Sequence, residues 1–161
     1  MMLRTHSTIL IRRKIEDVYQ FVAVEFFDNY PKWSPEVREL EKLTSGQIRV
    51  GVTARQVRQD AGHRSEALFQ VTDLRPPHEL RFASLSKPHF HVRYLFEPVA
   101  AGTRLTFSFQ LELPLFLRPL RGRIHDTLER GARQIVHNLK MLLEGDAAAE
   151  QEPGADGSAS G

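Results

Sequence analysis

Apolar and polar side chains alternate from residue 37 to residue 113, and this period of two constrains the fold more than any other feature. Successive side chains of a strand point to opposite sides, so the period predicts strands with one buried face and one wet face. The clearest stretch is TRLTFSFQLEL at 103–113, whose apolar face consists of Leu105, Phe107, Phe109 and Leu111. A single wet face is typical of an antiparallel sheet, in which short turns join neighbouring strands.

Seven strands are predicted in all, because a further apolar segment precedes the alternating region. Turn-forming stretches such as DAGH and VAAGT separate several of them. The predicted strands span residues 3–11, 37–44, 48–59, 65–74, 78–85, 90–98 and 103–113.

Two other segments have helical spacing. Residues 14–24 repeat apolar side chains at intervals of three and four, and a long helix is predicted from about residue 122 to 144. The long helix carries an apolar stripe made of Ile124, Leu128, Ala132, Ile135, Leu139 and Leu142. Such a stripe matches the apolar face of the sheet, which needs a cover.

The segment FFDNYPKWSPEV at 26–37 contains four aromatic residues, among them Trp33, the single tryptophan of the chain. Pro31 is expected to prevent a continuing regular helix and to bias Tyr30 toward an extended conformation, which leaves one or two short helical turns. Two interpretations stay open: the aromatic residues plug the core, or they form the wall of a ligand pocket.

The length of 161 residues predicts one domain at 1–145, followed by a tail at 146–161. The tail is rich in small and acidic residues, so it is predicted to be disordered. Without its four acidic residues the body has six more basic than acidic side chains. These basic residues are dispersed, and nucleic-acid-binding motifs are absent from the sequence, so no nucleic-acid partner is expected.

The chain contains no cysteine, which excludes disulfides, thiolate metal sites and a cysteine nucleophile. This composition fits a reducing compartment, and a cytoplasmic location is predicted. The N-terminal apolar run is too short for a signal peptide, and no stretch approaches the ~20 apolar residues of a membrane span.

Several short motifs follow one another along the chain. They are IEDVYQFVAV, then Asp28, Trp33 and Pro35, then PPHELRF at 76–82, FEPVAAGTRLTFSF at 96–109 and NLKMLLEG at 138–145. Taken in this order, they resemble the START-like or SRPBCC superfamily of polyketide cyclases/dehydrases and lipid-transport proteins. The resemblance covers roughly residues 3–145. It implies an α+β, Bet v 1-like helix-grip fold: a highly curved seven-stranded antiparallel sheet around a long C-terminal helix, with two short helices between strands one and two.

The resemblance also implies a function: binding a hydrophobic small molecule, such as a lipid, polyketide or quinone, between the sheet and the C-terminal helix. Such a site would be mostly apolar, with a few polar groups. A solid core remains the alternative for these side chains. The candidate ligand-binding residues are Trp33, Tyr30, Phe69, Phe82, Phe90, Tyr94, Phe107, Phe109, Leu128 and Ile135.

Two further functions stay open. A cyclase or dehydratase would need one or two general acid/base groups, for which Tyr94 and Asp28 are candidates. A protein-interaction module would need no ligand at all. No cofactor or metal is expected, because the H-x-H pair His89 and His91 lacks a third ligand at motif distance. The sequence does not indicate the oligomeric state.

Overall fold

The computed structural model describes the backbone of residues 1–160 and the side chains of residues 1–145. Seven strands form one open antiparallel sheet in the order β1-β7-β6-β5-β4-β3-β2, which confirms the predicted α+β architecture. The strands are β1 (Met2–Ile11), β2 (Val37–Lys42), β3 (Thr53–Asp60), β4 (His63–Arg75), β5 (Glu79–Ser84), β6 (Phe90–Val99) and β7 (Gly102–Glu112).

The helical elements are α1 (Ile15–Tyr19), a π-helix η1 (Gln20–Val24), α2 (Phe26–Trp33), a 3-10 helix η2 (Leu115–Leu120) and α3 (Arg121–Ser160). Two short helices therefore lie between β1 and β2, as predicted. The helix predicted at 14–24 is divided, because the amide of Glu25 donates to the carbonyl of Gln20 at 2.9 Å, five residues back. The side-chain amide of Asn29 donates to the carbonyl oxygen of Phe21 in η1 at 2.9 Å, so a side chain from α2 also bonds the backbone of the π-helix.

Pro31 lies inside α2, so the expectation that it prevents a continuing helix is wrong. The amide of Ser34 still donates to the carbonyl of Tyr30 at 3.1 Å, and Tyr30 is helical rather than extended. Packing explains the difference: the Tyr30 ring stacks on Phe26 with centroids 4.6 Å apart, and only a helical turn brings these two rings together. Tertiary contacts outweigh the local preference of a residue before proline.

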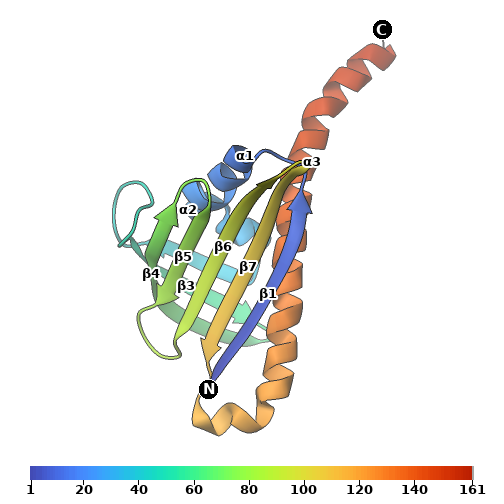
Figure 1. Ribbon diagram of the computed structural model, residues 1–161. Coiled ribbons are helices and arrows are strands. Elements are labelled where there is room, and N and C mark those ends of the chain that lie inside the picture. The colour runs from blue at the N-terminus through green and yellow to red at the C-terminus, as the bar shows by residue number, and fades with distance from the viewer. Residues whose placement is uncertain (161) are drawn as a thin grey trace.

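Helix α3 packs along β1 and β7 and covers one side of the sheet. Figure 1 shows it running beside β1 and extending past the upper end of the sheet, while α1 and α2 lie near that end. Of the predicted stripe, Ala132 and Leu139 are buried and the other members are half-buried. Val136 and Leu143 are also buried, so the contact face is wider than a single stripe.

The loop between β1 and α1 is hydrogen-bonded both to β7 and to α3. The hydroxyl of Thr103 donates to the carbonyl of Arg13 at 2.8 Å, and the Arg13 guanidinium donates to the carbonyl of Leu143 at 2.8 Å. Gly102 starts β7 with a φ of 144°, and a Cβ atom there would collide with the carbonyl oxygen of Ile11. The glycine of the predicted Gly-Thr hairpin is therefore required by close backbone approach.

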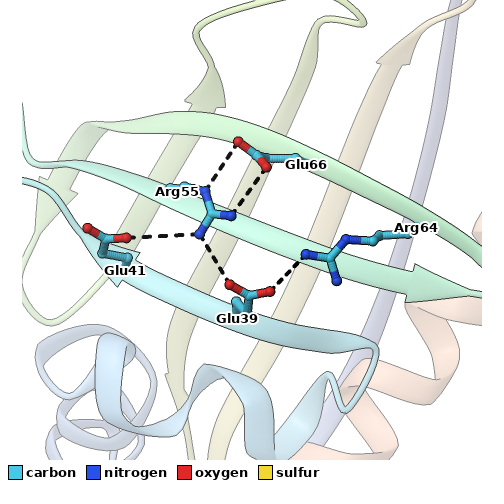
Figure 2. Close-up of polar contacts among 5 residues, drawn as sticks. All are labelled: Glu39, Glu41, Arg55, Arg64 and Glu66. Atoms are coloured by element: carbon cyan, nitrogen blue, oxygen red, sulfur yellow. Dashed lines mark hydrogen bonds and ion pairs between the residues drawn. The ribbon is translucent and has the colours of Figure 1, made fainter.

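The outer face of the sheet carries two ion-pair clusters. In the first, Arg55 on β3 lies between Glu39 and Glu41 of β2 and Glu66 of β4, and Arg64 also bonds Glu39 (Figure 2). This exposed cluster connects three neighbouring strands across their outer side chains.

The second cluster surrounds Glu79, whose side chain is only 5% exposed although it lies on the outer face. Arg93 donates to its carboxylate at 2.6 Å and Arg81 at 3.0 Å. Burial raises the pKa of Glu79, but the two arginines lower it by more, so the carboxylate has a depressed pKa.

The backbone of α3 continues into the segment predicted as a disordered tail, at 146–161, whose side chains lie outside the described residues. The domain boundary at residue 145 therefore stays a prediction. Over the described part of the chain, no helix combines the length and apolarity needed to cross a bilayer.

Candidate functional site

The aromatic side chains of α2 face the inner side of the sheet and form one cluster with aromatic residues of β4, β5, β6 and β7. Phe26 lies 5.3 Å from Phe82 between ring centroids, and Trp33 lies 6.1 Å from Tyr94. Of the predicted ligand-binding residues, the cluster brings together Trp33, Tyr30, Phe69, Phe82, Tyr94 and Phe107. Each of these side chains is buried, so we call this group the closed cluster.

The remaining predicted residues are less buried. Phe90 at the start of β6 and Phe109 near the end of β7 stack with centroids 6.0 Å apart, and both rings are half-buried. Leu128 and Ile135 on α3 are half-buried as well. Leu128 lies one helical turn before the buried Ala132, so both occupy the sheet-facing side of α3. The predicted set is therefore divided between the closed cluster, an incompletely covered end at Phe90 and Phe109, and two half-buried positions on α3.

Three polar groups of the closed cluster are paired inside it. The indole N–H of Trp33 donates to the hydroxyl of Tyr94 at 3.2 Å, and both atoms are buried. The hydroxyl of Tyr30 donates to the side-chain carbonyl of Gln56 at 3.0 Å, also in a buried environment. These bonds satisfy groups that would otherwise be costly to bury, so they fix the orientation of the rings.

Arg58 lies two residues after Gln56 on the inner face of β3, beside the Tyr30 hydroxyl. Its guanidinium makes a two-point contact with the carboxylate of Asp60, with N–O distances of 3.1 Å each. Burial acts to lower the pKa of Arg58, but Tyr30 and Asp60 act in the opposite direction and raise it, so the group stays cationic. A cation therefore borders the aromatic interior.

The sequence reasoning missed Gln56 and Arg58. The strand reads TARQVRQ, in which Val57 is the apolar residue, and alternation around Val57 assigns its two polar neighbours to the outer face. The register shows the reverse, since Gln56 pairs with Ala67 on the same face as Phe69. One signal was present in the sequence: Ala54 lies two residues before Gln56, so the two side chains share one face of the strand, and Ala54 is completely buried.

The candidate catalytic residues are not brought together. Burial raises the pKa of the Tyr94 phenol far above its ordinary value, so this group is a neutral hydrogen-bonding phenol and not a base. Asp28 lies in the first turn of α2 with its side chain exposed, outside the aromatic cluster. Arg58, Tyr30 and Tyr94 could orient an oxygen atom of a ligand, and none of them resembles an activated nucleophile.

Two surface features lie elsewhere. His125, Asp126 and Glu129 on α3 place potential ligand atoms within 4.8 Å of one another, but Asp126 is exposed and the other two are half-buried on the helix surface. A wide, open hollow of about 470 Å³ lies between the β6–β7 turn and the segment that connects β1 to α1, including the first residues of α1. Neither feature contains a predicted site residue.

Comparison with solved structures identifies the fold. The di-domain ARO/CYC StfQ from the steffimycin biosynthetic pathway superposes with a TM-score of 0.74 at 13% identity, over 92% of this chain and 52% of that one. The present chain therefore spans about half of StfQ. The Zhui aromatase/cyclase from Streptomyces sp. R1128 gives 0.74 at 16% identity, over 89% and 94% of the two chains. Ara h 8.0201 gives 0.68 at 10% identity, over 90% and 99%.

At these identities the superpositions show the fold alone, which is the helix-grip fold. No curated protein matches the chain significantly by sequence. A family model, however, matches residues 2–144, which is nearly the whole described domain. The chain belongs to the polyketide cyclase/dehydrase and lipid transport family.

Proposed function

We propose that the protein binds a hydrophobic small molecule between the inner face of the sheet and the first half of α3. The observation that carries this proposal is the uneven burial of the inner face. The rings packed against α2 are in mutual contact, whereas the stacked pair Phe90 and Phe109, and also Leu128 and Ile135 on α3, remain half-buried. Four large apolar side chains in partial contact with water favour a ligand that completes their burial.

Polar groups beside the closed cluster suggest how such a ligand would be oriented. Arg58 is cationic and Gln56 is an amide, and both lie on the inner face of β3. A carbonyl, phenol or carboxylate oxygen is the ligand group that these donors would recognise. A flat or elongated apolar molecule with one such oxygen, as in a lipid, polyketide or quinone, fits this combination. The cysteine-free chain is compatible with the proposed cytoplasmic location.

A matched pair of α3 variants tests the proposal. Leu128→Asp places a charge on the sheet-facing side of the helix, while Met141→Asp places the same charge at a position that is 60% exposed. The binding of 1-anilinonaphthalene-8-sulfonate, an apolar fluorescent probe, would be measured for both variants and the unmodified protein. We expect Leu128→Asp to weaken binding at least about ten-fold, since a desolvated charge is costly, and Met141→Asp to leave it unchanged.

Circular dichroism must show that both variants are folded. Equal probe binding by all three proteins, or no saturable binding by the unmodified protein, would contradict the proposal. Native mass spectrometry of the purified protein gives an independent readout, because a tightly held apolar ligand adds a discrete mass.

A second candidate function is cyclisation or dehydration of a bound polyketide. The observation that favours it is a buried phenol at Tyr94, bonded to Trp33, within range of the charge of Arg58; the two groups together could stabilise an enolate-like oxygen. Turnover of a poly-β-keto thioester would be compared between the unmodified protein and Tyr94→Phe and Arg58→Met. If turnover survives both substitutions, this assignment of residues is wrong.

A further inference from the structure

The 3-10 helix η2 exposes large apolar side chains to solvent. Leu115 is 73% exposed, Phe116 is 79% exposed and Leu120 is 45% exposed. We call these three residues the apolar tip. They follow directly after β7 and precede α3, on a six-residue helix in which no side chain is buried. Exposed apolar patches are typical of surfaces that bind a protein or a membrane.

The charged side chains between residues 113 and 125 are all basic. Arg118, Arg121 and Arg123 are all exposed, and the sequence from 113 to 125 contains no acidic residue. Glu112 precedes the segment at the end of β7, and Asp126 is the first acidic residue of α3. A tip with exposed leucine and phenylalanine side chains among arginines combines an inserting group with groups that attract anionic headgroups.

The position of the tip is favourable for contact with a flat surface. The amide of Leu113 donates to the carbonyl of Met1 at 2.8 Å, so the tip begins beside the start of β1. Figure 1 shows this segment projecting below the sheet at the same end as the N-terminus, away from α1 and α2. The amide of Glu112 donates to the carbonyl of His89 at 2.8 Å, which places the start of β6, and hence Phe90, at this end as well.

We propose that the apolar tip docks the protein on an anionic lipid surface, with Leu115 and Phe116 inserted between headgroups and the three arginines beside lipid phosphates. The docked protein would present its incompletely covered end to the membrane, so an apolar ligand could pass between lipid and protein with little exposure to water. Docking itself does not depend on the ligand proposed above, and the two are tested separately.

Vesicle sedimentation tests the proposal with the full chain. The vesicles are phosphatidylcholine alone, or phosphatidylcholine with phosphatidylserine at a ratio of about 7:3, at low salt. We expect binding to the anionic vesicles that weakens at high salt and is much lower on phosphatidylcholine alone. Each arginine near an anionic surface contributes about five-fold in affinity, so Arg118→Gln, Arg121→Gln and Arg123→Gln together should weaken binding by about two orders of magnitude.

Matched apolar variants identify the inserting residues. Leu115→Ser with Phe116→Ser should weaken binding roughly ten-fold or more, because the inserted apolar area is lost. The control is Leu43→Ser with Val50→Ser, which removes two side chains of 48% and 58% exposure from the loop between β2 and β3. The control should bind like the unmodified protein. All substituted side chains are exposed, so the melting temperatures should stay close to that of the unmodified protein.

Three results would overturn the proposal: no sedimentation of the unmodified protein with anionic vesicles, equal losses in the tip and control variants, or concentration-dependent dimers in analytical ultracentrifugation that only the tip variants abolish. The last result would assign the apolar tip to a second copy of the chain. Vesicle binding without binding of the fluorescent probe would leave docking intact and contradict the ligand-binding function, whereas the converse result would refute docking alone.

Discussion

The hydrogen bond between Trp33 and Tyr94 allows a quantitative test of the closed aromatic cluster. Tyr94→Phe removes the hydroxyl that accepts from the indole N–H at 3.2 Å and keeps the ring, including its contact with Phe107 at 5.3 Å. Trp33 is completely buried, so its N–H then has no access to water. A buried donor without an acceptor costs about 1–3 kcal/mol, and the free energy of unfolding should fall by this amount.

A double-mutant cycle separates the hydrogen bond from the packing of the two rings. Trp33→Phe removes the donor and also reduces the volume of the side chain, so its own cost includes a cavity. The double variant removes both partners, and no polar group is left unpaired. We therefore expect the double variant to be more stable than the sum of the single losses implies, by about 1 kcal/mol or more.

Urea unfolding followed by far-ultraviolet circular dichroism measures all four proteins, since the cycle removes the single tryptophan. In a chain of this size each kcal/mol shifts the melting temperature by about 2–4 °C, which gives a second readout. Additive losses within about 0.5 kcal/mol would show that the two groups do not interact, and the buried bond described here would then be wrong.

Three other predictions concern separate parts of the structure. Trp33→Ala should lower the free energy of unfolding by about 3–5 kcal/mol in urea titrations, and it should also weaken binding of the fluorescent probe. If neither stability nor probe binding changes, the segment 26–37 is only a connector. Asn138→Ala removes the bond from its amide to the carbonyl of Trp33 at 3.0 Å, and calorimetry should show a loss of about 0.5–1.5 kcal/mol. Burial raises the pKa of Glu79, but Arg93 and Arg81 lower it by more, so the pKa is depressed in the folded protein. The ionised carboxylate therefore stabilises the fold fully above the unfolded-state pKa of about 4.3. This contribution is lost as the pH falls through the lower folded-state pKa. Glu79→Gln should therefore destabilise the protein at pH 7 and have a much smaller effect at a pH below that value, and an equal effect at both pH values would contradict the ion pairs.

The alternating pattern was sufficient to predict the sheet, because every strand with a buried and a wet face repeats the same two-residue signal. The long helix was predictable for a similar reason, although the sequence stripe missed Val136 and Leu143, which adjoin predicted members on the same face. The matching apolar faces predicted that this helix packs on the sheet, and the resemblance to the family added the curved, seven-stranded helix-grip arrangement.

The interior was less predictable, because a buried polar residue interrupts the apolar half of the alternating pattern. Gln56 and Arg58 were hidden by Val57, an apolar neighbour on the opposite face, and Tyr30, the partner of Gln56, is 26 residues away in the sequence. The aromatic residues were correctly assigned to one face of the sheet, but alternation does not distinguish the fully buried rings from the half-buried ones. That distinction depends on how far α2 covers the inner face of the sheet.

The ion pairs in Figure 2 also affect the edge of the sheet that β2 forms. Strand β2 is an edge strand, and its backbone has unpaired hydrogen-bonding groups along one side. Its outward side chains Glu39 and Glu41 are held by Arg55, so the edge presents ordered charges at defined positions. A strand from another molecule that approached this edge would meet two carboxylates and would have to strip water from them. The same contacts that align three strands thus discourage the addition of a further strand, and they help to keep an open sheet from polymerising.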